Sequence, residues 1–338
     1  MMRMSRSHTL AFTFTLSAFA LAGAPGCAAQ DGDFTAGDPA AAEPIDSSEH
    51  AVAHGGPQLL WQNLASGEIS AWLLDGKRVT GTQPLSWQCG AAGACSSQWQ
   101  PIDTGYASIL WQNPSTGQVQ GWRFDSNGIV NTTPELSWRC DAASGCSTAW
   151  RPIGKVRIDG DQCDGLICGH EGLIWHNATS GEVGVWDLAF DGTTVLASRI
   201  LPWKCGVAGN CSLLWRAVLT ADFNGDGETD ILWHNASTGE VSAWLLKGAS
   251  VIGTQPLSWP CSQASGCAQS WRIVDAADVN HDGHVDLTWH NATTGEVSSW
   301  LLNGLGTVLG AYAFDWKCDA ACSANWKAIG YTTFPFSI

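Results

Sequence analysis

The chain has 338 residues, only 14% of them charged, and a formal net charge of −15 at pH 7 with histidine counted as neutral. This excess of negative charge argues against nucleic acid as a partner, because phosphate backbones are bound mainly by Lys and Arg. The 38 glycines and 20 tryptophans, together with abundant Ser and Thr, favour strands and turns over long helices.

The first 27 residues are typical of an export signal. Arg3 and Arg6 precede an apolar run over residues 10–22, which is too short for a transmembrane helix. Cleavage by ordinary signal peptidase competes with lipoprotein processing, in which Cys27 becomes the acylated first residue. Without Arg3 and Arg6, 14 basic side chains (16 minus 2) remain against 31 acidic ones.

Residues 28–56 lack periodicity and are rich in Ala, Asp, Glu, Pro and Gly, which predicts a flexible acidic tether. We therefore expect an outer-membrane or cell-surface lipoprotein, with a secreted or periplasmic protein as the alternative. The lipid anchor on Cys27 would then be its membrane contact.

From residue 57 onward the tryptophans form five sets of four, and the first two of each set are eleven residues apart. The register restarts every 50 to 64 residues, which is the period of a propeller blade or another repeat unit. The sets are Trp61, Trp72, Trp87, Trp99; Trp111, Trp122, Trp138, Trp150; Trp175, Trp186, Trp203, Trp215; Trp233, Trp244, Trp259, Trp271; and Trp289, Trp300, Trp316, Trp326.

Each unit predicts four strands. A short strand holds the first tryptophan, a Ser/Thr-Gly turn follows, and an alternating strand comes next. A third strand, such as residues 251–257, leads through a loop bounded by two cysteines to a last strand that begins at the fourth tryptophan. The first two strands are expected at 59–63 and 68–74, 109–113 and 118–124, 173–177 and 182–188, 231–235 and 240–246, and 287–291 and 296–302.

Twelve of the 13 cysteines form close pairs, and Cys27 is the odd one, which favours its lipidation. Export makes disulfides the favoured interpretation over reduced thiols. Zinc would need four ligands, and pairs on different blades lie too far apart to supply them. The pairs are Cys89 with Cys95, Cys140 with Cys146, Cys163 with Cys168, Cys205 with Cys211, Cys261 with Cys267 and Cys318 with Cys322.

Two acidic loops carry the strongest chemical signal, and each runs directly into a Trp-His-Asn strand. Their spacing lets four side chains wrap one ion, while the seventh residue (Glu228 or His284) offers its backbone carbonyl; oxygen ligands of this kind favour Ca²⁺. The predicted metal residues are Asp222, Asn224, Asp226, Glu228, Asp230, Asp278, Asn280, Asp282, His284 and Asp286.

These two loops with their following strands resemble FG-GAP/VCBS repeats, and the similarity covers roughly residues 57–334. The resemblance implies an integrin-α-like, all-β propeller with calcium loops between the first and second strands of its blades. In that phasing, residues 326–334 supply an orphan first strand that closes a blade with the strand near Leu59. We expect a monomeric ring of five four-stranded blades over residues 57–338, with another blade number, an incomplete ring or a homo-oligomeric ring as alternatives.

The third unit carries Asp159, Asp161 and Asp164, interrupted by the pair of Cys163 and Cys168. It is interpreted as a degenerate loop in which a disulfide replaces the ion, with residual calcium binding as the alternative. The first two units have no such acidic run, and we expect no ion there.

The turns between second and third strands of a blade should share one face with the cysteine loops, giving five similar clefts. Trp87, Trp138, Trp203, Trp259 and Trp316 precede those loops, where an exposed indole could stack on a sugar ring; packing between blades is the alternative. His176, His234 and His290 stand where the first two units have Gln62 and Gln112, which indicates hydrogen bonding rather than proton transfer. The Asn-x-Ser/Thr segments coincide with turns, so glycosylation is not expected.

The favoured function is a binding module that recognises glycans or protein partners through repeated sites, since multiplicity raises avidity. The alternative is a structural or assembly protein of the cell envelope that binds no small ligand. A propeller hydrolase or lyase is disfavoured, because no asymmetric set of catalytic groups stands out from the repeats.

Overall fold

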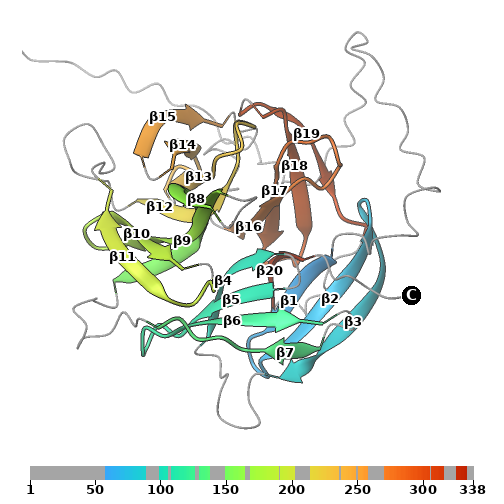
Figure 1. The fold of residues 1–338 in the computed structure, drawn as a ribbon. Helices are drawn as coiled ribbons and strands as arrows, with labels where there is room; N and C mark the ends of the chain where they lie inside the picture. The colour runs from blue at the N-terminus through green and yellow to red at the C-terminus, as the bar shows by residue number, and fades with distance from the viewer. Residues whose placement is uncertain are drawn as a thin grey trace, which may run out of the picture.

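A computed structural model describes residues 58–88, 99–105, 108–125, 129–137, 149–163, 168–189, 191–201, 214–235, 237–248, 250–257, 270–304, 306–315 and 325–332. These residues form five four-stranded antiparallel sheets arranged as a ring, so the predicted five-bladed propeller is confirmed (Figure 1). Within the described residues, no helix has the length and apolar character needed to cross a membrane.

Each sheet is one blade, numbered here in chain order. Blade 1 consists of β20 (Trp326–Thr332), β1 (Gln58–Asn63), β2 (Glu68–Asp75) and β3 (Arg78–Gln88). Blade 2 consists of β4 (Gln100–Gly105), β5 (Ser108–Gln112), β6 (Val119–Phe124) and β7 (Val130–Thr132). Blade 3 consists of β8 (Trp150–Cys163), β9 (Cys168–Asn177), β10 (Val183–Leu188) and β11 (Val195–Ile200). Blade 4 consists of β12 (Trp215–Ala221), β13 (Asp230–Asn235), β14 (Val241–Lys247) and β15 (Ser250–Pro256). Blade 5 consists of β16 (Trp271–Ala277), β17 (Asp286–Asn291), β18 (Val297–Leu302) and β19 (Val308–Ala313).

The ring closes between the two ends of the described chain. β20 pairs with β1 in antiparallel register, with Trp326 opposite Asn63 and Thr332 opposite Gln58. The first strands of the blades (β20, β4, β8, β12 and β16) line the axis, and each contacts the corresponding strand of both neighbouring blades. Closure gives β20 a partner and completes blade 1 with a fourth strand, like the other blades.

Contacts between paired tryptophans explain the eleven-residue spacing of the first two tryptophans in each repeat unit. The hairpin of β1 and β2 sets Trp72 opposite Leu59, two residues before Trp61 on the same face of the sheet. The first indole of each pair is almost completely buried, and the ring centroids of the two indoles lie 4.2 to 4.8 Å apart in the five blades. Such aromatic pairs contribute about 0.5–1.5 kcal/mol beyond their buried area.

A second aromatic contact joins neighbouring blades. The rings of His176 and Trp233 meet edge to face with centroids 5.0 Å apart, and His234 meets Trp289 in the same way at 5.9 Å. His290 repeats this contact with Trp61 at 5.0 Å across the closing joint of the ring. The closing joint is therefore built like the joints inside the array.

The turn after each first tryptophan is held by its asparagine. In the turn of blade 4, the Asn235 Oδ1 accepts hydrogen bonds from the backbone N–H groups of Ser237 and Thr238. Gly239 has a φ of 76° and donates its N–H to the Asn235 carbonyl, which explains the glycine at that place. The same contacts recur with Asn63, Asn113, Asn177 and Asn291.

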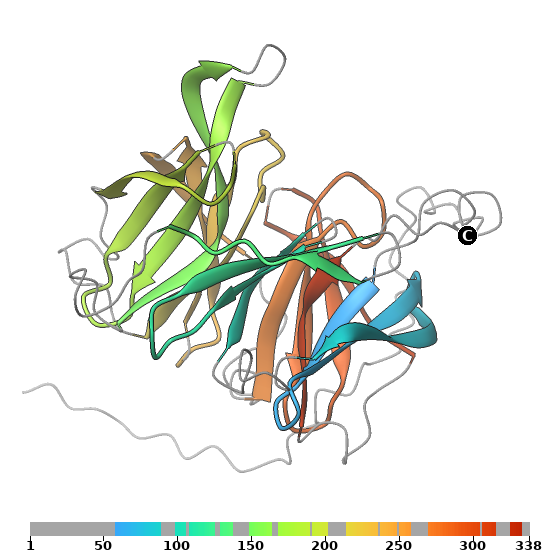
Figure 2. The same cartoon turned by 60° about the horizontal axis from the view of Figure 1, so that its bottom comes forward.

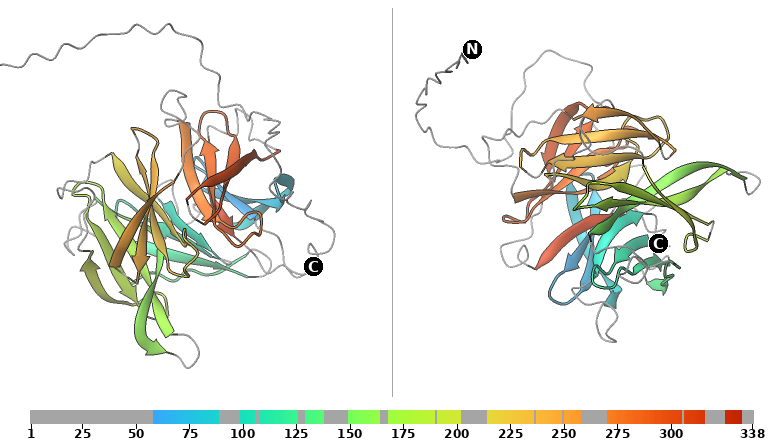
Figure 3. Two further views of the ribbon diagram at one scale, coloured as in Figure 1. Left: turned by 90° about the horizontal axis from the view of Figure 1, so that it is seen from above. Right: turned by 90° about the vertical axis from the view of Figure 1, so that its left-hand side faces the viewer.

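These turns lie beside the starts of the axial strands. The Ala178 N–H donates to the Ala149 carbonyl at 2.9 Å, and the Ala292 N–H donates to the Ser270 carbonyl at 2.9 Å. One face of the propeller, called the turn face below, therefore carries the asparagine turns and the entry of each axial strand. On the other side, the β8–β9 hairpin projects well beyond the neighbouring blades (Figures 2 and 3).

Candidate functional site: the aspartate loops and the axis

The aspartate loop of blade 4 connects β12 to β13. Asp222 holds its beginning, because its Oδ1 accepts from the N–H of Gly225 at 2.8 Å and its Oδ2 accepts from the N–H of Gly227 at 2.8 Å. The Asn224 Oδ1 accepts from the Asp226 N–H at 2.9 Å. Gly225 and Gly227 adopt φ values of 76° and 86°, which tighten the loop around these oxygens.

The aspartate loop of blade 5 connects β16 to β17 and repeats this geometry. Asp278 accepts from the N–H groups of Asp282 at 3.0 Å and Gly283 at 2.9 Å. His281 occupies the position of Gly225 and adopts a φ of 62°, although left-handed backbone is unfavourable for a residue with a Cβ. The same loop shape thus forms from two different sequences.

The last aspartate of each loop is fully buried and ties the loop to its blade. Asp230 accepts from the Phe223 N–H at 3.1 Å and, across the sheet, from the Leu246 N–H at 2.9 Å. Asp286 makes the matching bonds with the N–H groups of Val279 and Leu302. Both oxygens of each carboxylate therefore brace the start of the second strand of the blade.

The negative charges of the two buried carboxylates are electrostatically unfavourable when no cation is nearby. Burial raises the pKa of Asp230 to about 6, against the opposing effect of its two backbone hydrogen bonds, and the charges of Asp226 and Asp222 raise it further. Burial likewise raises the pKa of Asp286 to about 6, and Asp282 and Asp278 add to the shift. A cation in either loop would reduce this repulsion.

The donor types fit Ca²⁺, whereas the side-chain positions do not yet form a complete shell. Nowhere in the part of the chain that the structure describes do three His, Cys, Asp or Glu side chains converge at metal-binding distance. The carboxylates of Asp222 and Asp226 face backbone N–H groups, and the Asn224 amide donates to the Asp226 Oδ2 at 2.9 Å.

The seventh residue of each loop lies against the next turn of its blade. The Glu228 Oε2 accepts from the Gly248 N–H at 3.3 Å. His284 lies so close to Gly304 that a Cβ added there would approach the His284 Nδ1 to 2.6 Å. These side chains contact the neighbouring turn, while their backbone carbonyls are the atoms expected to face an ion.

Blade 3 lacks the buried carboxylate. Gly172 stands where blades 4 and 5 have Asp230 and Asp286, and a Cβ at Gly172 would collide with the Ile158 side chain. The β8–β9 ladder continues to Cys163 opposite Cys168, so a hairpin replaces the wrapped loop. Backbone register thus sets these two cysteines face to face, whereas the side chains of Asp159, Asp161 and Asp164 lie outside the described residues.

An axial group of polar residues was not foreseen from the sequence. The Asp275 Oδ2 accepts from the Tyr331 N–H of β20 at 2.6 Å and from the Thr104 hydroxyl of β4 at 3.1 Å. Gly330 permits this approach, because a Cβ there would meet both Thr104 and Asp275. Burial raises the pKa of Asp275 to about 7, and the charge of Asp103 raises it further.

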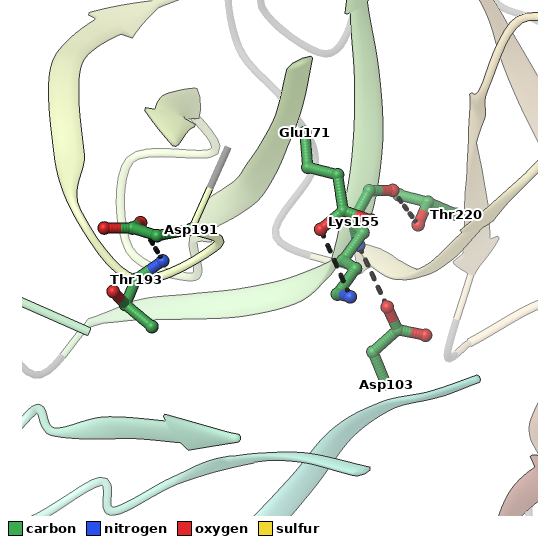
Figure 4. Close-up of polar contacts among 6 residues, drawn as sticks. All are labelled: Asp103, Lys155, Glu171, Asp191, Thr193 and Thr220. Carbon is green, nitrogen blue, oxygen red and sulfur yellow. Dashed lines mark hydrogen bonds and ion pairs between the residues drawn. The ribbon is translucent and has the colours of Figure 1, made fainter. Parts of the chain in front are cut away.

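The axial contacts continue through β8 and β12 (Figure 4). The Asp103 Oδ2 accepts from the Lys155 N–H at 3.2 Å, and the Thr220 hydroxyl donates to the Lys155 carbonyl at 2.6 Å. Lys155 Nζ also forms an ion pair with Glu171 at 3.3 Å. Burial raises the pKa of Asp103, against the opposing charge of Lys155. These contacts join blades 2, 3 and 4, and together with the contacts of Asp275 they link all five blades at the axis.

The tryptophans predicted to stack on sugars lie outside the described part of the chain. This holds for the side chain of Trp87 and for all of Trp138, Trp203, Trp259 and Trp316. Residues 1–57, including Cys27, also lie outside it. The sugar-stacking and lipidation predictions therefore remain predictions.

Ten of the twelve paired cysteines likewise lie outside the described residues, and only the backbone of Cys163 and Cys168 lies within them. The disulfide predictions for the five cysteine loops therefore remain predictions. The ten are Cys89 and Cys95, Cys140 and Cys146, Cys205 and Cys211, Cys261 and Cys267, and Cys318 and Cys322.

Comparison with known proteins supports the repeat type. Residues 222–289, from one aspartate loop through the next, match the model of the FG-GAP-like repeat. No curated protein is significantly similar to the chain.

Two similar solved structures are distant from this chain in sequence. One is the structure of an Agrocybe aegerita lectin that concerns specific recognition of non-reducing terminal N-acetylglucosamine. It is 12% identical to this chain, covers 83% of this chain and 86% of its own, and has a TM-score of 0.45. The other is the periplasmic gluconolactonase of Pseudomonas aeruginosa, with 13% identity, coverage of 77% and 69%, and a TM-score of 0.34. At these scores neither likeness bears on function. The topology identifies the chain as a five-bladed β-propeller, and residues 222–289 of it match an FG-GAP-like repeat.

Proposed function

We propose that this protein is an exported, calcium-stabilised binding module that recognises glycans or protein partners through repeated sites. The observation that carries the proposal is the turn face, where five equivalent asparagine turns lie around one ring. Repeated weak sites on a rigid body gain avidity for a polyvalent target.

Calcium has a structural role in this proposal. The aspartate loops lie at the opposite ends of the axial strands from the turn face, since Asp222 follows β12 whereas Trp215 begins it. An ion there would offset the repulsion around Asp230 and Asp286 without occupying the recognition surface.

The proposal contains no catalytic step. Outside the loops, burial raises the pKa values of Asp103 and Asp275, and both carboxylates accept backbone hydrogen bonds that connect neighbouring blades. The carboxylates of Glu182, Glu240 and Glu296 accept hydroxyl hydrogen bonds within their own turns. These contacts assign the groups to the scaffold.

A glycan array tests the proposal directly. The full chain, purified with calcium and immobilised through a C-terminal tag, should bind a restricted set of glycans, and a chelator should weaken the signal by lowering stability. A variant with Asp222→Asn and Asp278→Asn serves as the calcium-insensitive control. If no glycan binds and crosslinking on intact cells also captures no protein partner, the proposed function is wrong.

A further inference from the structure

The residue that follows the fourth tryptophan of each repeat unit forms a distinct set at the start of the axial strands. Register places these residues opposite the His or Gln of the following strand, as in Arg216 opposite His234 and Arg272 opposite His290. Four of the five are basic. The set is Gln100, Arg151, Arg216, Arg272 and Lys327.

These four basic residues, called the axial cations below, have no acidic partner among the described residues. Arg151, Arg216 and Arg272 are exposed, and Lys327 is half-buried. Elsewhere the structure pairs Lys155 with Glu171 and Arg199 with Asp187. The protein carries a formal net charge of −15, and yet the axial cations have no acidic partner among the described residues.

Neighbouring axial cations begin strands that contact one another, since β12 contacts both β8 and β16, and β16 contacts β20. Burial lowers the pKa of His176 to about 4, and the charges of Arg216 and Arg151, from two different blades, lower it further. Burial also lowers the pKa of His290 to about 4, with additional effects of Arg272 and Lys327 across the closing joint. The charge of Arg272 adds to the effect of burial in lowering the pKa of Lys327. Mutual repulsion of this kind is relieved when an anion binds between the cations.

The surroundings favour a sugar as the carrier of the negative charge. A half-buried indole precedes each axial cation in its strand, points to the opposite face of the sheet and packs with one side against an apolar cluster: Trp150, Trp215, Trp271 and Trp326. Indoles offer a flat apolar face to a sugar ring, and guanidinium groups bind carboxylates through paired hydrogen bonds. The negative body of the protein would repel a long polyanion, so a short chain or a chain end fits better.

We propose that Arg151, Arg216, Arg272 and Lys327 form an axial anion site on the turn face that binds an acidic oligosaccharide. This inference rests on the proposed function, because it specifies one ligand class and one place for a binding module. Gln100 leaves a neutral gap in the ring at blade 2.

Calorimetric titration with tetragalacturonate tests the site, and fully methyl-esterified tetragalacturonate is the matched neutral probe. The native protein should bind the acid at least tenfold more tightly than the ester, and rising salt should weaken binding of the acid. The double variant with Arg216→Gln and Arg272→Gln should lose at least tenfold in affinity for the acid. Gln already occupies this position in blade 2, so the fold should accept it, and an unchanged thermal unfolding curve confirms that.

Two further variants sharpen the result. Gln100→Arg should complete the ring and raise affinity for the acid severalfold, while Lys247→Gln removes an equal charge at the far end of β14 and should change nothing. Equal binding of acid and ester, or full affinity in the double variant, overturns the axial site but leaves the proposed function intact. Absence of binding to the acid also overturns it, and the glycan array then decides the proposed function separately.

Discussion

Blades 4 and 5 differ from blade 2 most clearly in the connection between their first and second strands. All three contain the buried tryptophan pair and the asparagine turn. Blade 2 joins β4 to β5 between the paired residues Gly105 and Ser108, whereas blades 4 and 5 insert an aspartate loop that ends in a buried carboxylate. The tryptophan pair and turn thus suffice for a blade, and the aspartate loop adds a charged brace that needs compensation.

Removing the buried carboxylate should have the largest effect. Asp230→Ala or Asp286→Ala leaves two backbone N–H groups without their acceptor, and we expect a loss of about 3 kcal/mol in the free energy of unfolding. The equivalent change in blade 2, Ser108→Ala, should cost less than about 1 kcal/mol. Urea unfolding in the presence of EDTA measures both without an ion. Equal costs in the two blades would show that the aspartate is no brace.

Calcium should stabilise the native protein through blades 4 and 5 alone. At a free concentration one hundred times the dissociation constant, each occupied site should add about 2.7 kcal/mol. Thermal unfolding with calcium and with EDTA measures the difference. The double variant with Asp222→Asn and Asp278→Asn should show a much smaller response. Native protein that unfolds identically in both buffers would contradict the calcium proposal.

Acid should destabilise the joints that contain histidine. His176 and His290 have a folded-state pKa of about 4 against an unfolded value of 6.5, so protons bind the unfolded chain first as pH falls. Their contribution to stability is complete above pH 6.5 and declines toward pH 4, by about 2 kcal/mol per histidine at pH 5.

The double variant with His176→Gln and His290→Gln tests this pH dependence with the residue that blades 1 and 2 already use. Urea unfolding in EDTA between pH 5 and pH 7.5 should show a flatter profile than the native protein. Retention of the native profile would mean that other groups cause the acid sensitivity.

The asparagine turns should show the smallest effect and no difference between the two kinds of blade. Asn113→Ala in blade 2 and Asn235→Ala in blade 4 each remove an oxygen that accepts from two backbone N–H groups, at a cost of about 1 kcal/mol. Chemical denaturation compares the two variants. A much larger cost in blade 4 would mean that its turn and its aspartate loop are coupled.

Sequence patterns predicted the blades because the pattern and the local structure have the same period. The eleven-residue spacing of Trp61 and Trp72 follows from one hairpin, and the glycine of each turn follows from its positive φ. The closing pair of β1 and β20 was also predicted, because the phasing implied by the FG-GAP/VCBS resemblance starts the repeats with a second strand near Leu59 and ends them with an orphan first strand.

The axial contacts could not be predicted in this way. The bond between the Thr104 hydroxyl and Asp275 joins residues 171 positions apart, and it depends on how closely Gly330 lets three strands approach. The basic second residues of the axial strands were visible as Trp-Arg or Trp-Lys pairs, but their grouping requires the closed ring. The need for glycine at position 172 could not be predicted either, because it depends on the Ile158 side chain that packs against it.

Native mass spectrometry of the full chain in calcium tests the difference between the blades most directly. Two bound calcium ions per chain are predicted, with one remaining in Asp222→Asn or Asp278→Asn alone. A protein that carries no calcium, or that keeps both ions in these variants, would contradict the assignment of the aspartate loops.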